Sequence, residues 1–145
     1  MATKLKTQLG MPKAAMRILA DNYFQSFQHL ASIQHYHTAI YISGYSVELY
    51  LKCAICQNLK VQNLPTVFEY HDLESLLFFA GLQSEISSNP LLQANWNGIQ
   101  TIWDVEMRYD DPRTSSLGAS DCAAVEMWLN GRQKGGLIPW LQTKI

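Results

Sequence analysis

The chain of 145 residues lacks the features that mark several large classes of protein. It has three cysteines, an odd number that does not fit a disulfide framework. No segment approaches the roughly 20 consecutive apolar residues of a membrane span. The N-terminus has no apolar stretch followed by a small-residue cleavage site, so we see no secretory signal. We therefore expect a cytoplasmic protein with no membrane partner.

An excess of charge of one sign is also missing. The formal net charge is −1 at pH 7, so the whole chain has no electrostatic attraction for nucleic acid or for an anionic membrane. A local basic patch is still compatible with this composition. The hydrophobic fraction of 48% is enough to build a core without disulfides or metal. We predict a single domain over residues 1–145, in which 1–11 and 131–145 are peripheral.

Sequence motifs for metal and redox chemistry are incomplete. Cys53 and Cys56 form a C-x-x-C, but they fall inside a hydrophobic segment with no second pair, which favours small core residues over zinc or redox chemistry. His29, His35 and His37 cluster without an acidic or thiol neighbour in the sequence, which favours an exposed polar loop over a metal site. We therefore expect neither a metal nor a cofactor.

Motifs for phosphate binding and nucleophilic catalysis are missing too. "GRQKGG" lacks both the preceding strand and the Lys-Ser/Thr ending of a phosphate-binding loop. Ser115 and Ser116, taken with the four histidines, do not form the pattern of a nucleophilic triad. An assignment of function from isolated motifs is therefore not possible.

What the sequence does contain is helical periodicity. Apolar residues recur at helical spacing from Pro12 to about residue 32, and a second apolar segment runs to about Asn58. The second segment is apolar all round, which predicts a central helix. Three shorter helices are expected to follow. The first is capped by Asp72. The second starts at Ser88 or Asn89 and ends near Tyr109, and the third starts at Ser120 or Asp121 and ends near Asn130. With "QSEISSNP" as a loop and "LIPWLQTKI" as a last turn or a docked tail, these segments predict an all-α, four- to five-helix up-and-down bundle.

The central segment "YISGYSVELYLKCAICQNL" holds an acid and a base in apolar surroundings. At about 100° per residue, Tyr41, Tyr45, Glu48 and Lys52 share one narrow sector of the helix. One interpretation is an i,i+4 Glu–Lys pair on a solvated face. The other is a pocket or interface, in which buried charges must be paired. Gly44 costs up to about 1 kcal/mol of helix propensity, which a close helix–helix approach would justify.

Three pieces of the sequence, in this order, resemble the HEPN domain family: "YISGYSVELYLKCAI", "HDLESLL" and "WDVEMRYDD", followed by a last helix with an apolar stripe. The resemblance covers about residues 12–130. It implies a small all-α bundle, usually a homodimer. It also implies a possible nucleotidyltransferase partner, because members often work beside minimal nucleotidyltransferases in toxin–antitoxin or phage-defence pairs.

The resemblance also implies a set of site residues. Many members are metal-independent RNases, with an arginine followed a few residues later by a histidine in a polar loop. Arg108 matches that arginine, but the following "YDDPRTSSLGAS" has no histidine, and none occurs after His71. The chain is therefore similar to the non-nucleolytic "RY" type, which binds a nucleotide or a partner. The implied site residues are Glu48, Lys52, His71, Asp72, Arg108, Tyr109 and Arg113.

Three hypotheses follow. In the first, the protein is a binding module for a nucleotide, an RNA or a partner. Arg108, Lys52 and Arg113 would contact the anion, Tyr109 and His71 would shape the site, and Glu48 would accept hydrogen bonds from Arg108 or Lys52. In the second, it is an RNase toxin in which His71 replaces the missing histidine and works with Arg108. In the third, it is an oligomerisation scaffold whose interface is the stripe of tyrosines.

Overall fold

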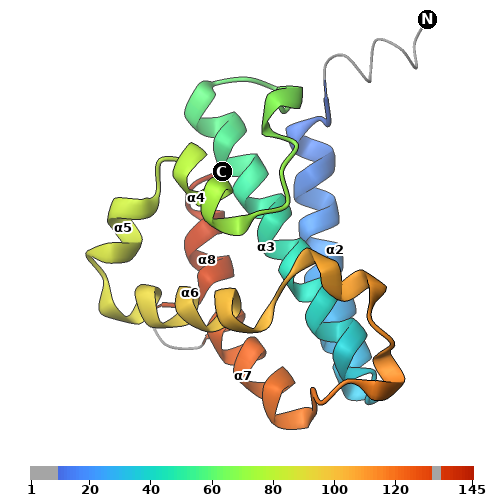
Figure 1. Cartoon of the computed structure of the whole chain (residues 1–145). Helices are drawn as coiled ribbons and strands as arrows, with labels where there is room; N and C mark the ends of the chain where they lie inside the picture. The colour runs from blue at the N-terminus through green and yellow to red at the C-terminus, as the bar shows by residue number, and fades with distance from the viewer. Residues whose placement is uncertain (1–9, 132–134) are drawn as a thin grey trace, which may run out of the picture.

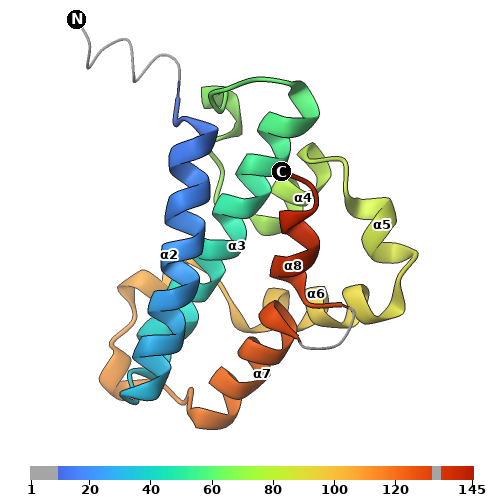
Figure 2. The same cartoon turned by 180° about the vertical axis from the view of Figure 1, so that it is seen from behind.

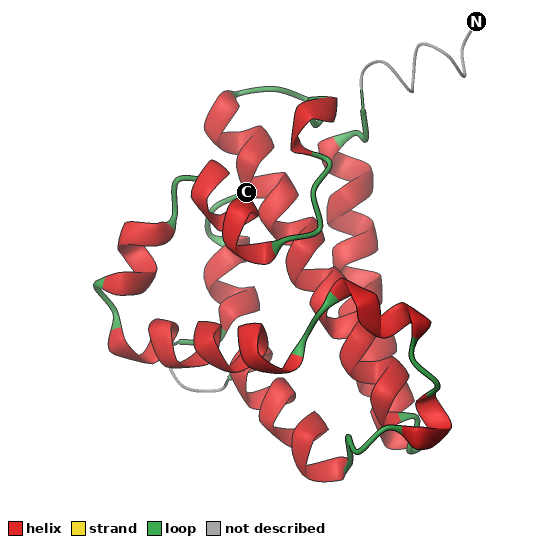
Figure 3. Ribbon diagram, in the orientation of Figure 1, coloured by secondary structure: helices red, strands yellow, loops and turns green. Residues whose placement is uncertain are grey.

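The computed structural model describes residues 10–131 and 135–145. Within these ranges the chain is helical and contains no strand beyond one isolated bridge between Pro12 and Asn63 (Figures 1 and 3). The predicted all-α class is therefore confirmed for this part. The predictions on residues 1–9 and 132–134 concern residues outside the described ranges. No helix in these ranges combines the length and apolarity needed to cross a membrane.

Helices α2 (Lys13–Ser32) and α3 (Tyr36–Leu59) form a long antiparallel hairpin and lie side by side in both views (Figures 1 and 2). The short turn between them places Gln34 at a left-handed φ of 67°. Lys60 ends α3 in the same conformation and donates its N–H to the carbonyls of Cys56 and Gln57. Both helices match the predicted boundaries closely.

Helix α3 is the centre of the fold, as its all-round apolar sequence predicted. It packs against α2, α4, α7 and α8. Gly44 permits one very close approach, because a Cβ at this position would lie 2.1 Å from the indole of Trp103. The expected helix–helix approach at Gly44 is therefore wrong: the close neighbour is the indole side chain of Trp103 and not another helix.

Two of the shorter helices begin at the predicted caps. Asp72 caps α4 (Leu73–Phe79) and accepts a hydrogen bond from the N–H of Ser75 at 3.0 Å. Asn89 caps α6 (Pro90–Ile102) and accepts from the N–H groups of Leu91 and Leu92. Local capping chemistry sets both of these helix starts.

The segment between α4 and α6 differs from the expected loop. Residues Gln83–Ser87 form the short helix α5. Outside this segment, a 3-10 turn, η1 (Thr66–Phe68), lies in the loop before α4. Leu82 and Ile86 are both buried. A five-residue helix is not stable alone, so α5 forms because tertiary packing covers its apolar side.

The predicted end of the fourth helix near Tyr109 is wrong. Helix α6 ends at Ile102, Trp103 is extended, and the chain continues as the 3-10 segment η2 (Val105–Tyr109). Trp103 donates from its indole Nε1 to the carbonyl of Tyr41 on α3 at 2.9 Å. Asp104 then starts η2 by accepting from the N–H of Glu106 at 2.7 Å. A tertiary hydrogen bond and a new cap thus end α6 before its apolar pattern ends.

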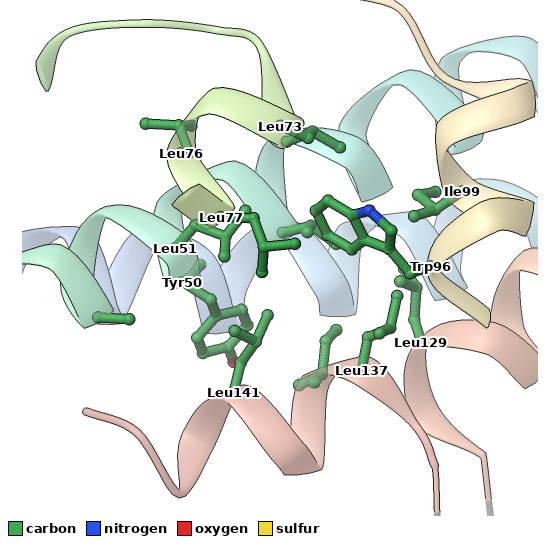
Figure 4. Close-up of a cluster of buried hydrophobic side chains, with 14 of the residues drawn as sticks. Tyr50, Leu51, Leu73, Leu76, Leu77, Trp96, Ile99, Leu129, Leu137 and Leu141 are labelled. Atoms are coloured by element: carbon green, nitrogen blue, oxygen red, sulfur yellow. The ribbon is translucent and has the colours of Figure 1, made fainter. Parts of the chain in front are cut away.

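The C-terminal part completes the core. After η3 (Pro112–Thr114) come α7 (Ala119–Asn130) and α8 (Leu137–Gln142). The segment 131–145 was expected at the periphery, but Leu137 and Leu141 are fully buried, so α8 belongs to the core. Figure 4 shows the side chains that meet there from α3, α4, α6, α7 and α8: Tyr50, Leu51, Leu73, Leu76, Leu77, Trp96, Ile99, Leu129, Leu137 and Leu141.

The arrangement is less regular than an up-and-down bundle. In Figures 1 and 2, α6 runs across the direction of α2 and α3. Helix α8 is fastened to α5, because Trp140 Nε1 and Lys144 Nζ donate to the carboxylate of Glu85 at 2.9 and 2.7 Å. The up-and-down description therefore fits the α2–α3 hairpin, and the shorter helices pack around one side of α3.

Candidate functional site

The acid and the base on α3 are buried. The Glu48 side chain is 1% exposed and that of Lys52 is 10% exposed. Lys52 Nζ donates to Glu48 Oε1 at 2.7 Å, so the two groups are paired, as burial requires. The interpretation as a pair on a solvated face is therefore wrong, and these two residues belong to the interior of the molecule.

His71 gives Glu48 a second partner from another part of the chain. Its Nδ1 lies 3.0 Å from Glu48 Oε1, and since a carboxylate only accepts, Nδ1 carries the hydrogen. The His71 side chain is 44% exposed, so it connects the buried carboxylate to the surface. Glu48 Oε2 is buried and has no hydrogen-bond partner among the described residues. Glu48 thus fastens the start of α4 to the middle of α3.

Aromatic rings surround this connection. The Tyr45 ring lies 5.3 Å from that of Tyr41, 6.1 Å from Tyr23, and 6.2 Å from both His71 and Trp103, measured between centroids. Burial, followed by the hydrogen bond with Tyr45, raises the pKa of Tyr41 to about 12. Both tyrosines are half-buried and are in contact with rings of their own chain.

The predicted contact between Glu48 and Arg108 is wrong. Arg108 is exposed and makes none of the ion pairs found within residues 10–131 and 135–145. Its guanidinium carbon lies 4.7 Å from the centroid of the Tyr109 ring. The reason is the early end of α6: Arg108 lies on η2 and therefore does not point along the α6 face toward the core.

Arg108 nevertheless lies near the same aromatic rings. Desolvation would lower the pKa of Arg108, but it is outweighed by the negative charges that Tyr109, Tyr45 and Tyr41 gain when they ionise and by hydrogen bonding with Tyr109, so that pKa is raised. Tyr45 therefore has the His71 ring beside it and is one of the groups that raise the pKa of Arg108. We name His71, Tyr41, Tyr45, Arg108 and Tyr109 the aromatic–cationic face.

The two remaining predicted site residues are engaged in local structure. Asp72 accepts from both the N–H and the hydroxyl of Ser75, which makes it the cap of α4. Arg113 is exposed and paired with Asp111 at 2.9 Å, and this hydrogen bonding lowers the pKa of Asp111. Arg113 is thus neutralised by its own loop, and Arg108 is a better candidate for an external anion.

A cleft of about 310 Å³ opens beside His71. Asp72, Gln100, Trp103 and Asp104 line it together with His71. One carboxylate oxygen of Asp104 accepts the N–H of Glu106 and so caps η2. The cleft therefore combines hydrogen-bond acceptors with an indole wall, next to the aromatic–cationic face.

A second polar cluster was missed. His37 was expected in an exposed loop with His29 and His35, but it is 8% exposed at the start of α3, while the other two are exposed. Its Nδ1 lies 2.9 Å from Ser115 Oγ, and its Nε2 lies 3.1 Å from the Met107 carbonyl. No sequence signal connects positions 37 and 115, because only the tertiary fold brings them together.

The cysteines have the environment of core residues. Cys53, Cys56 and Cys122 are buried and carry free thiols. Burial raises the pKa of Cys53 to about 12 and that of Cys122 to about 11. No group of three or more His, Cys, Asp or Glu residues in the described part of the chain is placed to hold a metal ion. The C-x-x-C therefore has the surroundings of a packed helix.

No family model, no curated protein and no solved structure matches this chain. What the protein does must therefore be inferred from its own residues.

Proposed function

We propose that the protein is a HEPN-like binding module that holds the phosphate of a nucleotide or of single-stranded RNA at Arg108. The observation that carries this proposal is the position of Arg108, which is exposed, has no carboxylate partner among the described residues and lies 4.7 Å from the centroid of the Tyr109 ring. A guanidinium presents donors in a planar fork that matches a phosphate. Aromatic rings next to it supply stacking surfaces for bases.

The buried Glu48 has an indirect role in this proposal. It does not touch the ligand. It holds Lys52 and His71, and so it fixes how the start of α4 meets α3. His71 and Tyr45 then lie side by side, with ring centroids 6.2 Å apart. Glu48 therefore positions the rings that form one side of the aromatic–cationic face.

The cleft beside His71 suits the uncharged part of such a ligand. Asp72 and Asp104 would repel a phosphate, so the phosphate is expected at Arg108. Amino groups of a base or hydroxyls of a ribose can donate to these carboxylates. The resemblance to HEPN domains adds a homodimer and a nucleotidyltransferase partner to the proposal, and the exposed ring of Tyr109, 71% accessible, supports a contact surface here.

We predict that Arg108→Ala weakens the binding of adenosine 5′-monophosphate and of a short single-stranded oligoribonucleotide by about tenfold or more. A hydrogen bond to a charged group contributes about 1.5–3 kcal/mol, and about 1.4 kcal/mol is a factor of ten. The fold should be unchanged, because the side chain is exposed. Isothermal titration calorimetry measures the affinity.

Two variants make this test specific. Arg108→Lys keeps the charge but loses the fork, so its affinity should be intermediate. Arg17→Ala removes a half-exposed arginine of α2 whose only ion pair in the described part of the chain is with Asp21, and its affinity should equal that of the unchanged protein. An Arg108→Ala variant that binds as tightly as the unchanged protein would remove Arg108 from the site.

A metal-independent RNase is the second candidate, and one observation favours it. His71 is half-exposed, and its Nδ1 is held by a buried carboxylate. Its Nε2 has no hydrogen-bond partner among the described residues. A carboxylate that orients a histidine is a common way to prepare a general base, here for the ribose 2′-hydroxyl. Gel analysis of the oligoribonucleotide after titration separates the candidates: intact RNA supports binding alone, and fragments support cleavage.

A further inference from the structure

The two hydrogen-bond partners of His37 determine which of its ring nitrogens carries the hydrogen. The Met107 carbonyl can only accept, so His37 Nε2, at 3.1 Å, carries a hydrogen and donates it. In the neutral ring the lone pair then belongs to Nδ1. Ser115 Oγ lies 2.9 Å from Nδ1 and donates its hydroxyl hydrogen to it. The serine hydroxyl is therefore hydrogen-bonded to a base.

The imidazole is held firmly in this orientation. His37 is buried near the start of α3, and its Nε2 bond reaches the backbone of η2. Ser115 Oγ also accepts the N–H of Leu117 at 3.2 Å. A donor on Oγ stabilises negative charge on that oxygen. A nucleophile, a base and a group that orients the base are the three parts of an activated serine.

His37 and Ser115 both line a cleft of about 410 Å³. Its polar lining includes Asp110, Asp111 and Thr114, and its apolar lining includes Ile102 and Leu117. Arg113 neutralises Asp111, while Asp110 makes no ion pair among the described residues. The charge in the cleft is therefore negative. It disfavours phosphates and carboxylates, which separates this cleft from the aromatic–cationic face.

We propose that Ser115 and His37 form a nucleophile–base pair that takes an acyl group from a small, uncharged ester. Ser115 Oγ forms a bond to the carbonyl carbon, and the bond from that carbon to the alcohol oxygen breaks. The serine proton moves to His37 Nδ1, which then protonates the departing alcohol. Water next attacks the acyl group on Ser115 and releases the acid, and Oγ regains its proton through His37.

The loop also offers a donor for the oxygen that becomes negative during this attack. The N–H of Ser116 has no acceptor among the described residues, and it follows the nucleophile directly. In serine hydrolases the N–H of the residue after the nucleophile often donates to this oxygen. The apolar side chains of Ile102 and Leu117 suit the acyl chain.

The test uses the full chain and p-nitrophenyl acetate. We expect release of p-nitrophenolate, and an acetyl group on the Ser115 peptide in mass spectra of quenched samples. Ser115→Ala should slow the release about a hundredfold, because base-assisted attack contributes about 10²–10⁴-fold. Ser120→Ala is the matched control, because this exposed serine in the first turn of α7 does not line the cleft, and it should retain at least half of the rate.

We do not replace His37, because it is buried and its replacement can disturb the fold. A second variant at position 115 tests the pair instead. Ser115→Cys keeps a nucleophile beside His37 and should be acetylated at residue 115 by the same ester. Circular dichroism confirms that each variant is folded. The proposal is overturned if Ser115→Ala releases p-nitrophenolate at the unchanged rate, or if no acetyl group appears on residue 115 in either the serine or the cysteine form.

Discussion

Replacing Glu48 with alanine is expected to lower the free energy of unfolding by about 3–5 kcal/mol, the range found when one partner of a buried ion pair is removed. Lys52 would be left buried with its ammonium unpaired, and His71 would lose the acceptor of its Nδ1 hydrogen. Equilibrium unfolding in urea measures the change.

Two further variants identify the cause of this loss. Glu48→Leu combined with Lys52→Met replaces both charges by apolar groups, and it should recover most of the stability. Arg17→Ala breaks an i,i+4 ion pair whose side chains are 42% and 44% exposed, so it should cost less than about 1 kcal/mol. A loss below about 1 kcal/mol for Glu48→Ala would show that the buried pair does not hold α3 and α4 together.

The second large effect is expected at Gly44. Alanine is the better helix former by up to about 1 kcal/mol, so a stabilised variant would result if only propensity mattered. The structure predicts the opposite sign, because the new Cβ would lie 2.1 Å from the indole of Trp103. That indole is buried and bonded to the Tyr41 carbonyl, so it cannot move away freely. We expect Gly44→Ala to destabilise the protein by about 1–3 kcal/mol.

Thermal unfolding of a matched glycine variant checks this. Gly118→Ala adds the same methyl group where nothing lies within 4 Å of the new Cβ, and its stability should change by less than about 0.5 kcal/mol. The combination of Gly44→Ala with Trp103→Leu should cost less than the sum of the two single changes. A more stable Gly44→Ala variant would mean that Trp103 does not pack on α3 at this point.

The parts of the fold that could be predicted from the sequence are those with local causes. Asp72 and Asn89 cap their helices through side-chain bonds to N–H groups two or three residues away, so the residue types alone indicate the helix starts. The early end of α6 has a distant cause. Trp103 leaves the helix and bonds to Tyr41, 62 positions earlier in the chain, and no local pattern contains that information.

The same distinction applies to the candidate site. Glu48 and Lys52 are four residues apart on one helix, so their pairing could be predicted, but their burial depends on elements that pack around α3. The expected Arg108 contact failed because it assumed that α6 continues to Tyr109. His37 and Ser115 could not be paired at all, since 78 positions separate them. Local rules thus supplied the residues on α3, and the tertiary fold decided their partners.

The central claim is that the aromatic–cationic face, positioned by Glu48 and open at Arg108, is where a phosphate-bearing ligand binds. Its most direct test is an aromatic proton–carbon nuclear magnetic resonance spectrum recorded during titration with a short single-stranded oligoribonucleotide. We predict that the ring signals of Tyr109, Tyr45 and His71 shift together, while those of Tyr50 and Tyr70 stay in place. Unchanged signals from Tyr109, Tyr45 and His71 at saturating ligand, or shifts confined to Tyr50 and Tyr70, would contradict the claim.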